Sequence, residues 1–233
     1  MIEPLNAVVF YLVFLMSTVL HEAAHAWTAM RGGDPTAYHG GQVSLDPRPH
    51  MQREPFGMIM LPLISLAASG WIFGYASAPY DPRWAERHPK RAALMSLAGP
   101  ASNLLLVLAA WIVIRGGTAF GWFAAPMSIG FDRIVEAPAG GLVGVLALVL
   151  SVVFSLNLLL AVFNLIPFPP LDGSGVLPVV LPERAMHAYR SLLAGRPALA
   201  WVGIIGAWMI FDRVFPPIWL AAVHLLYPGP GYG

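Results

Sequence analysis

The chain has 233 residues, of which 58% are hydrophobic and only 11% are charged, and its net charge is +1. Soluble domains carry about 25% charged residues, so this composition excludes an ordinary soluble protein and indicates an integral membrane protein. The chain has no cysteine and no basic patch interleaved with aromatic residues, which excludes disulfides and thiolate metal sites and predicts no nucleic-acid partner.

The first apolar run covers roughly residues 4–30 and is long enough to cross a hydrocarbon layer of about 30 Å. Its second half contains His21-Glu22-Ala23-Ala24-His25. Two histidines four residues apart lie on one face of a helix and can bind one zinc ion, and the glutamate between them is placed to act as a base on a water molecule. A charged group at membrane depth costs about 2.5 kcal/mol or more, so a metal explains this cluster better than a solvated face does.

The next hundred residues mix polar and apolar segments. Residues 34–55 are polar, and the weak alternation of 42–45 predicts a short strand there. Residues 56–78 are apolar but are interrupted by glycine and proline, and the topology argued below favours a re-entrant segment over a spanning helix. Residues 80–91 are basic and amphipathic, which is typical of a segment at the membrane surface.

Two clear spans are predicted at about 92–114 and 140–165, with a loop over 115–138 and a partly polar stretch over 174–196. The last apolar portion, 197–227, is split by charged residues and by Pro216-Pro217, which predicts either one span with an interfacial helix or a tight hairpin.

The predicted fold is therefore an all-α polytopic membrane protein with about four to six transmembrane helices and a re-entrant or short β segment near the active site. We expect one membrane domain over 1–233, with its core in 5–175 and a C-terminal helical segment in 197–227. The sequence has no internal repeat, so the inverted-repeat architecture of many transporters is not supported.

A catalytic zinc ion usually has three protein ligands. The candidates for the third are His39, His50, Asp46, Asp81, Asp172 and His224. Asp172 is preferred because it follows the proline-rich, broken end of a span, and unwound backbone at membrane depth is tolerated where it lines a cavity. The alternative is an aspartate in an ordinary Pro-Pro-x-Asp-Gly turn.

The distribution of basic residues predicts the topology. If Asp172 is to meet the two histidines, an even number of spans must separate them, so 92–114 and 140–165 cross the membrane and 56–78 dips and returns. All Lys and Arg residues except Arg115, Arg133 and Arg213 then lie on the side of the motif. By the positive-inside rule, the N-terminus faces outward and the metal site lies toward the cytoplasm.

Three stretches together resemble the site-2 protease family of intramembrane metalloproteases, in its compact bacterial form without a PDZ domain. They are the His21–His25 motif, Gly99-Pro100-Ala101-Ser102-Asn103, and Asn164-Leu165-Ile166-Pro167-Phe168-Pro169-Pro170-Leu171-Asp172-Gly173. The resemblance covers most of 5–175. It departs at 73–79, where compact members have a Gly-Trp-Ala-Lys-Pro-Val-Pro type stretch and this chain has neither the tryptophan nor the lysine, which affects the expected substrate preference and not the zinc chemistry.

The resemblance implies that one zinc ion is bound by His21, His25 and Asp172, that Glu22 is the general base, and that Asn164 helps to hold the oxyanion. It implies hydrolysis of peptide bonds within or near transmembrane segments of membrane-protein substrates, as in regulated intramembrane proteolysis, at the cytoplasmic side of a bacterial plasma membrane. The abundance of Ala, Pro, Gly and Arg with little Lys is typical of a bacterium with a GC-rich genome. The role of His50 and the oligomeric state stay open.

Two other interpretations belong to different classes of protein. A membrane metal transporter would place polar residues along 92–114 and 140–165, but those spans are almost purely apolar. A catalytically silent scaffold that binds membrane helices would not need the complete His21–His25 motif. The sequence therefore favours a zinc metalloendopeptidase over both.

Overall fold

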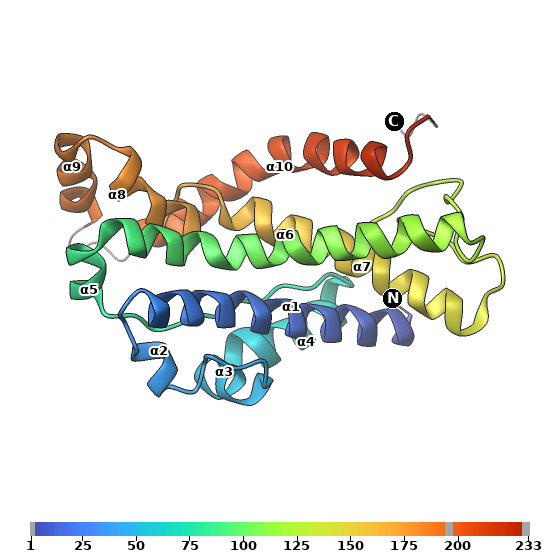
Figure 1. Cartoon of the computed structure of the whole chain (residues 1–233), viewed down its shortest axis with the longest axis horizontal. Coiled ribbons are helices and arrows are strands. Elements are labelled where there is room, and N and C mark those ends of the chain that lie inside the picture. Colours follow the sequence, from blue (N-terminus) through green and yellow to red (C-terminus); the bar gives the residue numbers. More distant parts are fainter. Residues whose placement is uncertain (1–2, 194–197, 230–233) are drawn as a thin grey trace.

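The structure is a computed structural model and describes residues 3–193 and 198–229. In these ranges four helices are long and apolar enough to cross a membrane (Figure 1). They are α1 (Pro4–Arg31), α6 (Pro89–Ala119), α7 (Gly141–Asn164) and α10 (Ala198–Leu226). The prediction of an all-α polytopic membrane protein is confirmed, at the lower end of the expected number of spans.

The remaining elements are short and connect these spans. They are α2 (Thr36–His39), α3 (Pro47–Arg53), the π-helical turn η1 (Phe56–Met60), α4 (Leu61–Ser69), α5 (Pro82–Arg87), the 3₁₀ turn η2 (Asp172–Val176), α8 (Leu177–Val180) and α9 (Glu183–Leu193). Figure 1 shows α5 and α9 at one end of the molecule, and the N-terminus and the α6–α7 loop at the other.

Helices α1, α6 and α7 pack against one another and form the central bundle, and α10 packs against α7. One buried cluster joins α1 to α4 and α7 through Val9, Phe10, Val13 and Phe14 on α1. A second cluster joins α6, α7 and α10 near the α6–α7 loop. The loop itself is fixed to α7 because the amides of Ile134 and Val135 both donate to the Ser151 hydroxyl, at 2.9 and 3.2 Å.

The apolar segment 56–78 does not form a spanning helix. The helical part, Phe56–Ser69, is shorter than the about 20 residues that a membrane requires. It ends at Gly70, which adopts the left-handed conformation (φ 71°) and donates to the Leu66 carbonyl. The chain then returns as an extended segment through residue 81, and Gly74 lies directly against the Phe14 ring of α1. The prediction that 56–78 does not form a spanning helix is confirmed.

The short strand predicted for 42–45 is wrong. The amide of Gln42 donates to the Ala37 carbonyl at 3.0 Å, and the amide of Asp46 donates to the Ser44 hydroxyl at 3.0 Å. Local turns therefore satisfy this backbone, which leaves it no reason to pair as a strand. In the part of the chain that the structure describes, β pairing is limited to two isolated bridges in the α6–α7 loop.

The predicted split of 197–227 is also wrong over the described residues, which begin at 198. Helix α10 continues through Pro216 and Pro217 to Leu226. Prolines are tolerated in membrane helices because neighbouring groups and local adjustments satisfy the freed carbonyls. The aromatic rings of Phe211 and Phe215 stack at 4.8 Å on one face, while Asp212 is exposed on another.

A buried carboxylate fixes the end of α1 to the start of α5. Asp34 accepts hydrogen bonds from the amide of Thr36 at 3.0 Å and from the amide of Asp81 at 2.7 Å. Burial alone would raise the pKa of Asp34, but hydrogen bonds from the Thr36 hydroxyl and these two amides outweigh it and hold that pKa below its ordinary value. The carboxylate therefore stays ionised and secures the turn that follows the histidine motif.

Candidate metal centre

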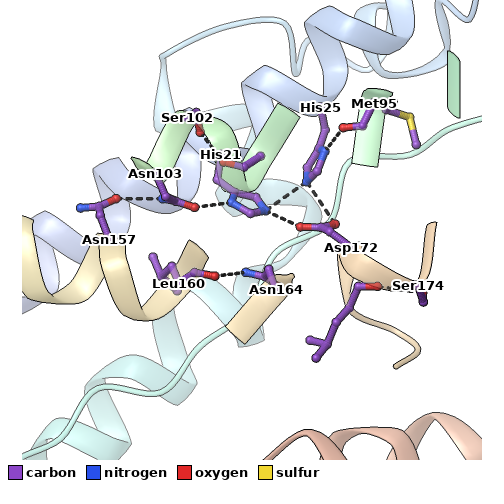
Figure 2. A network of polar contacts seen from close by, with 12 residues as sticks. His21, His25, Met95, Ser102, Asn103, Asn157, Leu160, Asn164, Asp172 and Ser174 are labelled. Carbon is purple, nitrogen blue, oxygen red and sulfur yellow. Dashed lines mark hydrogen bonds and ion pairs between the residues drawn. The ribbon is translucent and has the colours of Figure 1, made fainter. Parts of the chain in front are cut away.

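Helix α1 places both motif histidines on the face that packs against α6, where each is less than 10% exposed. Asp172 reaches them from the start of η2 (Figure 2). Its two carboxylate oxygens lie 3.0 Å from His21 Nε2 and 3.3 Å from His25 Nε2, and the two Nε2 atoms are 3.0 Å apart. The structure thus brings Asp172 to two histidines that precede it by about 150 positions in the sequence.

The other ring nitrogens are fixed by hydrogen bonds. His25 Nδ1 lies 2.6 Å from the Met95 carbonyl oxygen, which can only accept, so Nδ1 carries the proton. His21 Nδ1 lies 2.6 Å from Asn103 Oδ1. Both rings therefore turn an unprotonated Nε2 toward the same point, as histidines that bind metal do.

The spacing of the donor atoms fits zinc. Tetrahedral zinc with bonds of 2.0–2.2 Å holds its ligand atoms about 3.3 Å apart. Here the two Nε2 atoms are 3.0 Å apart, and one Asp172 oxygen lies 3.0 Å from His21 Nε2 while the other lies 3.3 Å from His25 Nε2. The donors are two imidazoles and one carboxylate, a set typical of catalytic zinc sites.

Gly99 of α6 keeps this point accessible. A Cβ atom at this position would lie 2.3 Å from His25 Nε2 and 2.5 Å from His21 Nε2. Any side chain at position 99 would therefore occupy the place where the donor atoms converge. The sequence motif around Gly99 was predicted to matter, but only the fold shows what this glycine does.

Tight packing of the segment after α7 places Asp172 beside the two histidines. A Cβ atom on Gly173 would lie 2.2 Å from the Leu165 carbonyl oxygen, and one on Gly175 would lie 2.1 Å from Ser96 Oγ of α6. Both glycines allow close contact with the neighbouring helices. The carboxylate oxygens of Asp172 therefore face the two unprotonated Nε2 atoms at 3.0 and 3.3 Å, as ligands that share one cation do.

The two remaining predicted residues lie next to the cluster. Glu22 follows His21 on α1 and is 5% exposed. Asn164 is the last residue of α7, and its amide nitrogen donates to the Leu160 carbonyl at 3.0 Å. In Figure 2 Asn164 lies beside the three clustered residues, with its amide directed to its own helix.

The rejected candidates for the third ligand have other places in the structure. Asp46 and Asp81 cap α3 and α5 by accepting from the amides of the second residues of these helices. His50 is 1% exposed, and its Nε2 donates to the Ser44 carbonyl at 3.0 Å. Within the described ranges, His21, His25 and Asp172 are the one group of histidines and acidic residues suited to hold a metal ion.

Comparison with known proteins identifies the family. The family model for peptidase family M50 matches residues 9–194. The chain belongs to peptidase family M50. This M50 chain is 33% identical over 181 residues to the putative zinc metalloprotease YwhC of Bacillus subtilis strain 168, an alignment that covers 77% of the chain and 72% of YwhC.

It is also 34% identical over 187 residues to the putative zinc metalloproteases Rip2 of Mycolicibacterium smegmatis and of Mycobacterium tuberculosis H37Rv. These alignments cover 78% of the chain and 62% of Rip2, so the M50 chain matches under two thirds of the length of its mycobacterial relatives. No solved structure matches the chain.

These findings confirm the predicted family, enzyme class and cofactor. The M50 protein is a multi-pass membrane metalloprotease of the site-2 type, and zinc is its metal. The donor set described above fits that ion, because it offers three nitrogen and oxygen ligands and leaves the fourth position of a catalytic zinc site open.

Proposed function

We propose that this M50 protein hydrolyses peptide bonds within or near transmembrane segments of membrane-protein substrates, as part of regulated intramembrane proteolysis. In this proposal, His21, His25 and Asp172 bind the zinc ion and Glu22 is the general base. The observation that carries it is the position of the three converging side chains, inside a bundle of helices that are long enough to cross a membrane. A metalloprotease with its site there acts on substrates that share the membrane.

The chemistry divides between the metal and the chain. Zinc in such a site would polarise the scissile carbonyl and lower the pKa of bound water to about 7. Glu22 takes the proton from the attacking water and passes it to the leaving amine. Its burial removes competing bulk water, and its neighbours in sequence, His21 and Ala23, are also buried.

Asn164 is proposed to donate to the oxyanion. One hydrogen of its amide already bonds to the Leu160 carbonyl, and this contact fixes the plane of the amide. The second hydrogen stays available for the substrate. A donor held in place before reaction stabilises developing charge better than one that must reorient.

The extended segment 71–79 is proposed to hold the substrate by strand addition. It pairs with no strand in the described part of the chain, but the amides of Phe73 and Tyr75 already donate to Ser65 Oγ and the Gly57 carbonyl, so a substrate would pair along the opposite edge. The Phe73 ring lies 6.2 Å from Trp208, whose ring lies 4.9 Å from Phe163, the neighbour of Asn164. A transmembrane helix must unwind before its backbone can be attacked, and an extended partner offers hydrogen bonds that replace those lost.

The site is proposed to lie toward the cytoplasmic side of a bacterial plasma membrane, within a single domain spanning 1–233. The basic residues of α5 and of the start of α6 lie at one end of the bundle (Figure 1). The histidine motif is in the C-terminal half of α1, which is the half nearer this end. The positive-inside rule assigns this end to the cytoplasm. The relatives named above are bacterial.

Replacement of His21 or Asp172 with alanine is expected to remove zinc from the purified protein. Each substitution leaves two ligands where a catalytic zinc site needs three. Elemental analysis should find about one zinc ion per chain in the wild type and a small fraction of that in both variants. His39→Ala is the matched control because His39 is exposed on α2, outside the cluster. Full zinc occupancy in Asp172→Ala would assign the third ligand to another residue.

Replacement of Asn164 with alanine is expected to lower kcat by about 10²- to 10³-fold while zinc content stays unchanged, because loss of one oxyanion donor has this effect in other proteases. The measurement is cleavage of a single-span substrate in detergent, with the zinc content of each preparation as the control. An unchanged kcat would remove Asn164 from the oxyanion site.

A further inference from the structure

A chain of buried amides leads from His21 through the centre of the bundle (Figure 2). His21 Nδ1 is bonded to Asn103 Oδ1 of α6 at 2.6 Å, and Asn103 Nδ2 donates to Asn157 Oδ1 of α7 at 2.8 Å. Asn157 Nδ2 donates in turn to the Val153 carbonyl at 2.8 Å and to Ser17 Oγ of α1 at 2.9 Å. Both asparagine side chains are 0% exposed, so no solvent competes for these bonds.

The order of donors and acceptors along these hydrogen bonds decides whether His21 can bind a metal. An asparagine amide has an accepting and a donating end of nearly equal size, and either end can face a neighbour. If Asn103 presented its NH₂ group to His21 Nδ1, the imidazole proton would move to Nε2. A protonated Nε2 has no lone pair to offer a metal ion.

A backbone carbonyl sets the direction. The Val153 oxygen can only accept, so Asn157 must face it with its NH₂ group. The Asn157 oxygen then faces Asn103 and requires the NH₂ group of Asn103 on that side. This leaves the Asn103 oxygen for His21, where it requires a proton on Nδ1.

We infer that Asn157 is a positioning residue, which acts through Asn103 to hold His21 in the tautomer that binds zinc. The inference rests on the proposed ligand role of His21. His25 needs no such chain because the Met95 carbonyl fixes its tautomer directly. The group that faces His21 Nδ1 is the amide of Asn103, which could present either its oxygen or its NH₂ group. The orientation of that amide must therefore be set by its own neighbour, Asn157.

The test is the zinc affinity of Asn157→Leu, measured by competition with a chelator of known affinity. Leucine has the same number and branching of side-chain heavy atoms as asparagine, but it offers no hydrogen bond that could orient the Asn103 amide. We expect the zinc dissociation constant to rise about 10- to 100-fold, the usual effect of losing a group behind a metal ligand. The matched control is Ser155→Ala on the same helix, which removes the partly buried hydrogen bond that Ser155 Oγ accepts from Trp219 Nε1 of α10 and should leave zinc affinity unchanged.

A rescue variant distinguishes the effect of the Asn103 amide orientation from the effect of altered packing at position 157. In Asn103→Asp, both carboxylate oxygens accept, so His21 Nδ1 must carry the proton whatever residue stands at 157. We expect the double variant Asn103→Asp/Asn157→Leu to bind zinc more tightly than Asn157→Leu alone. A merely structural role for Asn157 predicts the reverse, because the double variant adds a buried charge to a weakened core.

Two results would overturn the inference: wild-type zinc affinity in Asn157→Leu, or no recovery in the double variant. If Asn157→Leu does not fold, Asn157→Ser gives the same test, because serine is too short to bridge Asn103 and the Val153 carbonyl. Failure of the proposed function looks different, since His21→Ala would then retain zinc.

Discussion

Replacement of Glu22 with glutamine is expected to abolish peptide hydrolysis while leaving about one zinc ion per chain. Glutamine has nearly the same size as glutamate but cannot accept the proton of the attacking water. General-base catalysis contributes about 10²- to 10⁴-fold to the rates of enzymes that use it, so the loss should be at least of this size. The measurement pairs zinc analysis with cleavage of a panel of single-span model substrates by the detergent-purified protein.

The matched control is Glu136→Gln, which makes the same change in the α6–α7 loop at the opposite end of the bundle. It should cleave at the wild-type rate. Cleavage by Glu22→Gln at a rate close to wild type would contradict the general-base assignment. Zinc in every variant with no cleavage even by the wild type would instead favour a scaffold that binds membrane helices.

Replacement of Gly99 with alanine is expected to remove zinc almost completely, although the change adds one carbon atom to a residue that is not a ligand. The added Cβ atom would lie 2.3 Å from His25 Nε2 and 2.5 Å from His21 Nε2. Both rings are held from behind by hydrogen bonds to α6, so neither can move away without breaking one. Elemental analysis should find little zinc, and cleavage should fall with it.

Gly116→Ala is the matched control on the same helix. A Cβ atom at position 116 meets nothing within 4 Å, and alanine favours a helix by about 1 kcal/mol over glycine. This variant should keep its zinc and its activity and unfold at a temperature no lower than wild type. If Gly99→Ala bound zinc as tightly as wild type, the metal would not lie where the two Nε2 atoms converge.

The sequence predicted those features of the fold that depend on local pattern. The histidine motif occupies one helical face because its spacing is four residues, and the spans follow from the lengths of their apolar runs. The dip of 56–78 followed from a constraint on topology, since Asp172 had to return to the side of the motif. The strand at 42–45 was predicted wrongly because side-chain alternation carries no information about hydrogen bonds within nearby turns.

The features that the sequence did not predict depend on contacts between distant helices. Pattern alone could not show that Gly99 lies against the histidine rings, since that contact depends on how α6 crosses α1. Asn157 carries no local signal of its function, as it is one of four polar residues in an otherwise apolar helix. Its role appears only when α7 places it between Asn103 and the Val153 carbonyl.

The long separation between the proposed ligands has a consequence for biosynthesis. The two histidines leave the ribosome with α1, but Asp172 follows only after α6 and α7 have been made. A nascent chain that has inserted one or two spans has an incomplete ligand set and holds catalytic zinc poorly. With the proposed ligand set, the protease gains its activity only after its third span, α7, has been made and Asp172 has followed it.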